Sequence, residues 1–334
     1  MANAAIKPRA ETACRLCRGE AVKTKGQRLI AIKNMKHLSE IVDAALAKGR
    51  KRLAVAYGQD SHTIEAVYDA YKDGLVDATL FGDKEVILAT CAELGIDPSI
   101  FTIVDEKSDV KCVELAVKAV VAGDAQVLMK GMVSTDKYMR GILNKEAGLF
   151  PPKGTLSHVS VFEWSGYPKL LLASDIAVLP QPDFKQKLTL VKYLAQTAKL
   201  LGVDCPKIAC VAAMELVNAN MPAMAEGAII SKMADRGQLG NVIVDGPLSL
   251  DVALYPEVAE HKKVKGSAVA GDADALLFPN LESGNVFFKS VSHIGGGELA
   301  AMVVGTNKPC VLTSRGDSAL SKKYSIALAC LAAK

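Results

Sequence analysis

Aromatic residues make up only 5% of the 334-residue sequence. The sequence also has no apolar run that is long enough to cross a bilayer. No run of Lys and Arg is interleaved with aromatic residues, so we do not expect nucleic acid as a partner. The basic N-terminal segment is not followed by the apolar stretch of a secretory signal. These absences favour a cytoplasmic protein without membrane attachment. The formal net charge of +4 favours anionic ligands only weakly.

The sequence also lacks the motifs of common metal sites and of several enzyme classes. Only Cys14 and Cys17 have a suggestive spacing, and neither a second cysteine pair nor a nearby histidine completes a zinc site. We therefore predict free thiols in a reducing compartment and no metal, with a redox or metal role for this pair as the alternative. No Walker lysine loop, G-x-S-x-G elbow or H-E-x-x-H motif occurs.

The residues that are present point to an α/β protein. Half of them are hydrophobic and 23% are charged, as in ordinary globular proteins. With few aromatics, Ala, Val, Leu and Ile must fill the core, which is typical of buried parallel strands. The runs "KRLAVAYG", "DATLFGD", "FTIVD" and "AQVLMKG" are predicted strands, and segments of helical period separate them. This alternation predicts a parallel sheet covered by helices.

The chain length suggests about two domains. The strand–helix rhythm breaks at "LFPPKG", which predicts a boundary near residues 150–154. Beyond it, "LSHVSVFEW" and "KLLLASD" are expected to form a hairpin, and "DFKQKLTLVKYLAQTAKLLG" a long helix. A last strand "PCVLTS" and helix "ALSKKYSIALACLAA" fit either domain on pattern alone. We expect residues 1–28 to be a leader, partly flexible, with the fold proper starting near Leu29.

The turn "TSRGDS" joins the last predicted strand to the last predicted helix. Ligands of open parallel sheets bind beyond the carboxyl ends of strands, where a following helix presents free N–H groups and a partial positive charge. Ser314 can donate its hydroxyl, and the planar guanidinium of Arg315 matches two phosphate oxygens. Gly316 has no side chain, so the backbone there can approach a ligand closely. The alternative is a plain turn in which Asp317 or Ser318 caps the helix.

The segment "MKGMVSTDKYMRGILNKEAGL" has the same design. A strand ends at Lys130, and Ser134 or Thr135 is placed to cap the helix that follows. Lys137 and Arg140 are three residues apart, so they share one face of that helix. The face is either part of an anion site or a solvated basic surface, and spacing alone favours the surface.

Two further polar turns follow predicted strands. "LESGNVFFKSV" contains Gly284, Asn285 and Lys289 after the strand "ALLFP", and "VDGPLSLD" has Asp245 at a strand end. Each turn is a weak signal by itself. Together with the two turns above, they predict one cleft on which four strand ends converge.

The blocks "LSHVSVF", "VDGPLSLDVA", "GDADALLFPNLESGNVFFKSV" and "KPCVLTSRGDSALSKKYSIALA", with the segment above, resemble the phosphate acetyl/butyryltransferase family, most closely its phosphate butyryltransferase branch. The resemblance runs from about residue 29 to the C-terminus. It implies two α/β/α domains with mostly parallel sheets and an interdomain cleft, similar to isocitrate dehydrogenase. Residues 29–152 plus 305–334 would form the first domain and 153–304 the second. It also implies a homodimer or larger homo-oligomer.

The reaction implied is acyl-CoA + phosphate ⇌ acyl phosphate + CoA, by direct displacement in a ternary complex with a short acyl group. Coenzyme A would be a substrate, with no permanently bound cofactor. The resemblance puts Ser314 and Arg315 at the CoA–phosphate centre, and Arg140 is similar to a family arginine. Acetyltransferase members have an Asp where this chain has Ser321. Asp317, the nearest carboxylate, is then either the base for the CoA thiol or a helix cap.

Two other functions fit the same architecture. A metal-dependent oxidative decarboxylating dehydrogenase would need clustered carboxylates and a nicotinamide site, which the Asp and His pattern does not supply convincingly. A CoA-binding protein without catalytic activity fits the loss of the family Asp at Ser321. Turnover of acyl phosphates with CoA separates the three.

Overall fold

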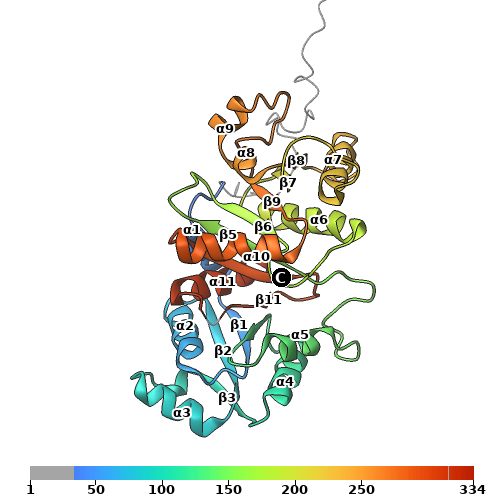
Figure 1. Ribbon diagram of the computed structural model, residues 1–334. Coiled ribbons are helices and arrows are strands. Elements are labelled where there is room, and N and C mark those ends of the chain that lie inside the picture. Colours follow the sequence, from blue (N-terminus) through green and yellow to red (C-terminus); the bar gives the residue numbers. More distant parts are fainter. Residues whose placement is uncertain (1–33, 315) are drawn as a thin grey trace, which may run out of the picture.

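The computed structural model describes residues 34–314 and 316–334, which build a mixed α/β fold around a single 11-stranded sheet (Figure 1). The strand order is β3-β2-β1-β4-β11-β10-β5-β6-β9-β7-β8. The strands are β1 (Lys51–Ala56), β2 (Val76–Gly82), β3 (Thr102–Asp105), β4 (Val127–Lys130), β5 (Ser157–Glu163), β6 (Leu171–Ser174), β7 (Lys207–Val211), β8 (Ile243–Leu248), β9 (Ala275–Leu277), β10 (Glu298–Val304) and β11 (Cys310–Val311).

Helices cover both faces of the sheet. The α-helices are α1 (Leu38–Ala47), α2 (Ser61–Lys72), α3 (Lys84–Glu93), α4 (Asp109–Ala122), α5 (Thr135–Leu143), α6 (Phe184–Leu200), α7 (Pro222–Asp235), α8 (Leu250–Leu254), α9 (Pro256–His261), α10 (Leu281–Lys289) and α11 (Ala319–Ala332). A 3-10 turn, η3, spans Pro98–Ile100, and a π-helical turn, η4, spans Ser290–Ile294. Side-chain caps fix several starts: Asp60, for example, accepts a hydrogen bond from the Thr63 amide at the start of α2.

The predicted βαβ rhythm is confirmed, because β1, β2, β3, β4 and β11 are all parallel to their neighbours in this part of the sheet. The predicted hairpin is confirmed as the antiparallel pair β5–β6. The C-terminal strand β11 pairs with β4, and α11 packs against β10, α1 and α2. The division into two domains stays a prediction, since strands of both predicted segments share the one sheet.

The two halves of the sheet run in opposite directions. The antiparallel pairs are β11–β10, β10–β5 and β5–β6, all at the centre, while β6, β9, β7 and β8 are parallel to one another. Figure 1 shows this central region between α2 to α5 at one end of the molecule and α7 to α9 at the other. The central strands therefore connect two parallel α/β halves.

The hydrophobic core is continuous on one face of the sheet and divided on the other. Alternate residues of β1 separate the faces: Leu53 and Val55 join the continuous cluster, and Ala54 and Ala56 join a cluster with residues of α4 and α5. On that second face, residues of α8 and α10 build a separate cluster with the other half of the sheet. The gap between these two clusters is where a cavity can form.

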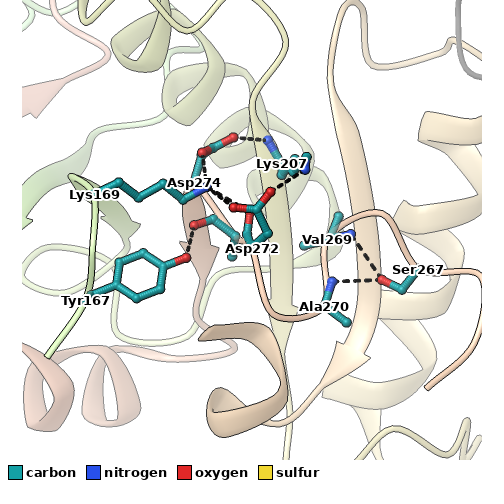
Figure 2. Close-up of polar contacts among 9 residues, drawn as sticks. Tyr167, Lys169, Lys207, Ser267, Val269, Ala270, Asp272 and Asp274 are labelled. Atoms are coloured by element: carbon teal, nitrogen blue, oxygen red, sulfur yellow. Dashed lines mark hydrogen bonds and ion pairs between the residues drawn. The ribbon is translucent and has the colours of Figure 1, made fainter. Parts of the chain in front are cut away.

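A partly exposed polar cluster holds together the loops at the start of β6, β7 and β9 (Figure 2). Asp274 accepts hydrogen bonds from Lys169 Nζ at 2.6 Å and from the Lys207 amide at 2.9 Å. The Asp272 carboxylate accepts from both lysine side chains, and Tyr167 donates to the Ala273 carbonyl at 2.6 Å. These contacts fix the position at which β9 begins. Because α10 follows β9 directly in the chain, they also help to position α10.

Asp274→Asn is expected to lower the free energy of unfolding by about 2 kcal/mol, because it removes a charged acceptor whose side chain is only 13% exposed. Asp235→Asn is the matched control. Its ion pair with Lys232 is exposed, and its loss should cost below about 0.5 kcal/mol. Urea unfolding of both variants measures the difference, and equal stabilities would contradict a structural role for the cluster.

Within the described part of the chain, no helix reaches the length and hydropathy of a membrane-spanning segment. In the same residues, no three or more His, Cys, Asp or Glu side chains gather in a way that could hold a metal ion. Cys14, Cys17 and the leader expected over residues 1–28 lie outside the described residues. Burial raises the pKa of the Cys210 and Cys310 thiols to about 12.

Candidate functional site

A cavity of about 440 Å³ lies on the divided face of the sheet, and its lining residues come from both sides of the gap. Its floor is made by His158 and Ser160 of β5 and by Leu299 and Ala301 of β10. Ser160 lies opposite Ala301 in the antiparallel ladder. Because every second residue of a strand faces the same side, these four side chains share one face at the centre of the sheet.

The turn from β4 to α5 forms one wall of the cavity. Lys130, at the end of β4, is 5% exposed, and its Nζ donates to the Gly131 carbonyl at 3.2 Å. Ser134 caps α5, and it lines the cavity together with Thr135. Tyr138 holds this helix against the sheet by donating to the Val311 carbonyl at 3.1 Å. The free amides at the start of α5 therefore face the cavity with a partial positive charge.

The turn from β11 to α11 forms the adjoining wall, with Thr313, Ser314 and Asp317. Ser318, not Asp317, caps α11: its hydroxyl accepts from the Ser321 amide at 2.9 Å. Asp317 instead accepts from the Ser314 amide at 2.6 Å and closes the turn. Burial raises the pKa of the Asp317 carboxyl, and the hydrogen bond from Ser314 works against this rise.

Helix α10 supplies the third wall, with Asn285, Phe288 and Lys289. It approaches the chain after β6 closely: a Cβ on Gly284 would lie 2.3 Å from the Asp175 carbonyl oxygen. Only glycine allows this approach without displacing the helix. Asn285 Nδ2 then donates to the Ile176 carbonyl at 3.1 Å, and Lys289 Nζ lies 4.0 Å from the Phe288 ring centroid.

The structure brings together most of the residues predicted from the four turns. Lys130, Ser134, Thr135, Asn285, Lys289, Ser314 and Asp317 all line the cavity. Gly284 packs behind the wall, and Gly316 is an exposed residue of the turn whose amide lies 3.4 Å from Ser314 Oγ. Arg315 lies outside the described residues, so its predicted role stays a prediction.

Besides Gly284 and Gly316, two predicted residues, Arg140 and Asp245, do not line the cavity. The Arg140 side chain is 78% exposed and pairs with Asp136 one turn away, and Lys137 pairs with Asp109 at 2.6 Å. The face of α5 that carries Lys137 and Arg140 is therefore a solvated basic surface, which is the alternative that the spacing of these two residues favoured. Asp245 lies in β8 at the edge of the sheet and accepts hydrogen bonds from the Gly246 amide and Ser231 Oγ.

Ser321, which the sequence resemblance aligned with an Asp of acetyltransferase members, is buried and makes structural hydrogen bonds. Its hydroxyl donates to Glu298 at 2.6 Å and accepts from the Leu299 amide at 2.9 Å. It thus ties α11 to the start of β10 and is not among the residues that line the cavity. The position of Ser321 therefore does not support a role for its hydroxyl in proton transfer.

Three polar lining residues, His158, Ser160 and Thr313, were not among the predicted ones. A signal for two of them exists in "LSHVSVFEW", where His158 and Ser160 alternate with Val159 and Val161. The alternation places both polar side chains on one face of a strand. That this face borders a cavity could not be known from the strand alone, because the cavity needs α5, α10 and the β11–α11 turn.

Charge and apolar surface are both present in this cavity. Lys130 and Lys289 supply positive charge, and two helices begin at its wall. Val133, Ala177, Phe288, Leu299, Ala301 and Leu312 supply apolar surface. An anionic group and a short apolar chain can therefore be held side by side.

Comparison with known proteins agrees with this chemistry. Residues 109–330 match the family model described as phosphate acetyl/butaryl transferase. The chain is similar to the phosphate butyryltransferase of Clostridium acetobutylicum (43% identity, 90% of this chain and 99% of the relative) and the phosphate acetyltransferase of Thermotoga maritima (39%, 87% and 98%). Its fold is similar to the crystal structure of a branched-chain phosphotransacylase from Enterococcus faecalis V583, with a TM-score of 0.76, 28% identity, and coverage of 85% of this chain and 100% of that one.

Proposed function

Because the chain belongs to the phosphate acetyl/butaryl transferase family and is an enzyme of this acyl-transferring class, we propose that the cavity interconverts a short-chain acyl-CoA and phosphate with an acyl phosphate and CoA. The observation that carries the proposal is the meeting of cationic, hydroxyl and apolar groups in one cavity between two helix N-termini. No redox cofactor and no metal enters the proposed reaction.

The anionic groups bind at the polar walls. Lys130 and the amides at the start of α5 suit inorganic phosphate, because a fixed cation and free N–H groups both favour negative charge. Lys289 and Asn285 face the same cavity from α10 and suit a second anionic or polar group, such as part of CoA. Arg140 and Asp245 do not line the cavity and are left out of the proposed site.

The chemical step is a direct displacement in a ternary complex. A phosphate oxygen attacks the thioester carbonyl carbon, the carbon–sulfur bond breaks, and the thiolate leaves. Ser314 Oγ donates to the developing oxyanion or to the thiolate, and Arg315 offsets the charge with its planar fork. Asp317 keeps the Ser314 turn closed through the hydrogen bond from the Ser314 amide. Holding both substrates in line contributes roughly 7–11 kcal/mol at best.

The acyl chain occupies the apolar part of the cavity. Val133 and Leu312 lie on one side of it and Phe288 on the other, with Leu299 and Ala301 in the floor. The cavity is about 440 Å³ and must also admit phosphate and the end of CoA, which favours a short acyl chain. Acetyl, propionyl and butyryl groups are therefore the proposed substrates.

Ala301→Val is expected to lower kcat/KM for butyryl phosphate about tenfold relative to acetyl phosphate, because two added carbon atoms in the floor remove space for the chain end. Initial rates of CoA consumption with both acyl phosphates give the ratio. Ala228→Val, in the groove beside α7, is the control and should leave the ratio unchanged. An unchanged ratio in Ala301→Val would place the acyl chain elsewhere.

The function itself is tested by loss of free CoA thiol with acetyl, propionyl or butyryl phosphate, without added metal. Turnover with at least one acyl phosphate is expected. CoA binding without turnover would favour a non-catalytic CoA-binding protein, and nicotinamide reduction with a hydroxy acid would favour a dehydrogenase. A homodimer or larger assembly and a cytoplasmic location are part of the proposal, and light scattering after size-exclusion chromatography tests the first.

A further inference from the structure

His158 is a buried titratable residue in the cavity floor that the acyl-transfer scheme above does not use. It lies on β5, opposite Val303 of β10, and the residue is 4% exposed. Its Nδ1 lies 3.4 Å from Ser160 Oγ, while Nε2 has no hydrogen-bond partner among the described residues. A buried polar atom without a partner is costly, so it marks a position where a ligand atom can complete the contact.

The charged groups that face this imidazole come from four elements. Asp175 follows β6, Asp317 precedes α11, Lys130 ends β4, and Lys289 lies in α10. Burial lowers the pKa of His158, whereas Asp175, the Leu312 backbone carbonyl and Asp317 oppose that effect by favouring the protonated ring. The ring is therefore neutral near pH 7, and the carboxylates are placed to stabilise it if it gains a proton.

We propose that His158 is the proton acceptor for the CoA thiol, with the ring proton on Nδ1 toward Ser160 and the Nε2 lone pair toward the substrate. This inference rests on the proposed acyl transfer and adds the residue that moves its proton. When acyl phosphate reacts, the S–H proton passes to Nε2, the sulfur forms a bond to the acyl carbon, and the carbon–oxygen bond to phosphate breaks. In the opposite direction the imidazolium returns the proton to the departing thiolate.

The other nearby candidates are already engaged. The Asp317 carboxylate accepts from the Ser314 amide at 2.6 Å, and the Ser321 hydroxyl is held by Glu298 and the Leu299 amide. Nε2 of His158 has almost no solvent-accessible surface, so the thiol reaches it when substrate entry moves the side chains that cover it. Catalytic hydrogen bonds commonly tighten only in the substrate complex.

The test is the pH dependence of CoA acylation by His158→Gln. At pH 7 the variant should be about 100-fold slower than the wild type, the lower end of what a general base contributes. A CoA thiol with a pKa of about 8.5 ionises by itself at higher pH, so the rate deficit of the variant should shrink below about tenfold by pH 9. A deficit that is the same at all pH values, or no deficit, overturns the proposal.

The wild type provides the second measurement if His158→Gln does not fold. With an internal base, its rate should vary little from pH 7 to 9, whereas a rate that climbs about tenfold per pH unit toward pH 8.5 overturns the proposal. His261→Gln, at the exposed end of α9, is the matched control and should keep the wild-type profile. A wild type that is silent with every acyl phosphate would refute the proposed function, whereas an active wild type with an unchanged His158→Gln refutes this inference alone.

Discussion

Arg315→Lys is expected to lower turnover about 100- to 1000-fold while leaving the fold intact. The arginine follows Ser314, whose side chain lines the cavity, and precedes Gly316. Its planar guanidinium is proposed to hold two phosphate oxygens at once and to offset the charge of the transition state. A lysine keeps the charge but presents a single ammonium group, so the paired hydrogen bonds are lost.

Steady-state rates of CoA consumption with butyryl phosphate measure the effect, and thermal unfolding checks the fold. Arg236→Lys, at the C-terminal end of α7, is the control and should keep the wild-type rate. Near-normal turnover of Arg315→Lys would remove Arg315 from the proposed mechanism.

Ser314→Ala is expected to lower kcat about 100-fold, which corresponds to about 3 kcal/mol of lost transition-state stabilisation. The hydroxyl is proposed to donate to the oxyanion or to the thiolate. The Asp317 contact uses the Ser314 backbone amide, so the turn itself should survive the substitution. The predicted signature is therefore a lower kcat with a much smaller change in KM, since the contact is made mainly in the transition state.

The matched control is Ser99→Ala, at an exposed position in η3, for which no change in rate is expected. A rise in KM at constant kcat for Ser314→Ala would instead indicate that the hydroxyl binds substrate equally well before and during the reaction. That result would leave the site in place and exclude the donor role.

Some elements were shorter than their sequence pattern suggested. The predicted strand "PCVLTS" is paired only at Cys310–Val311, because Leu312, Thr313 and Ser314 leave the ladder to line the cavity. Likewise, the predicted strand "ALLFP" is paired only at Ala275–Leu277, because Pro279 has no amide hydrogen to donate to a strand ladder. In both places the last residues of a strand pattern lie outside the sheet.

Hydrophobic periodicity and turn residues are local features, because they depend on a few neighbouring positions in the sequence. They were enough to predict the α/β class, the β5–β6 hairpin and the polar turns at Lys130, Ser314 and Asn285. Only the tertiary structure determined which of these turns lie next to one another. The antiparallel strands β5 and β10 reverse the direction of half the sheet, which leaves Asp245 at a distant edge while α10 returns to the centre. The surroundings of His158 also depend on the tertiary structure, because they come from β6, β10, α10 and the β11–α11 turn. These segments lie far apart in the sequence, so no local sequence pattern predicts that they pack around one histidine.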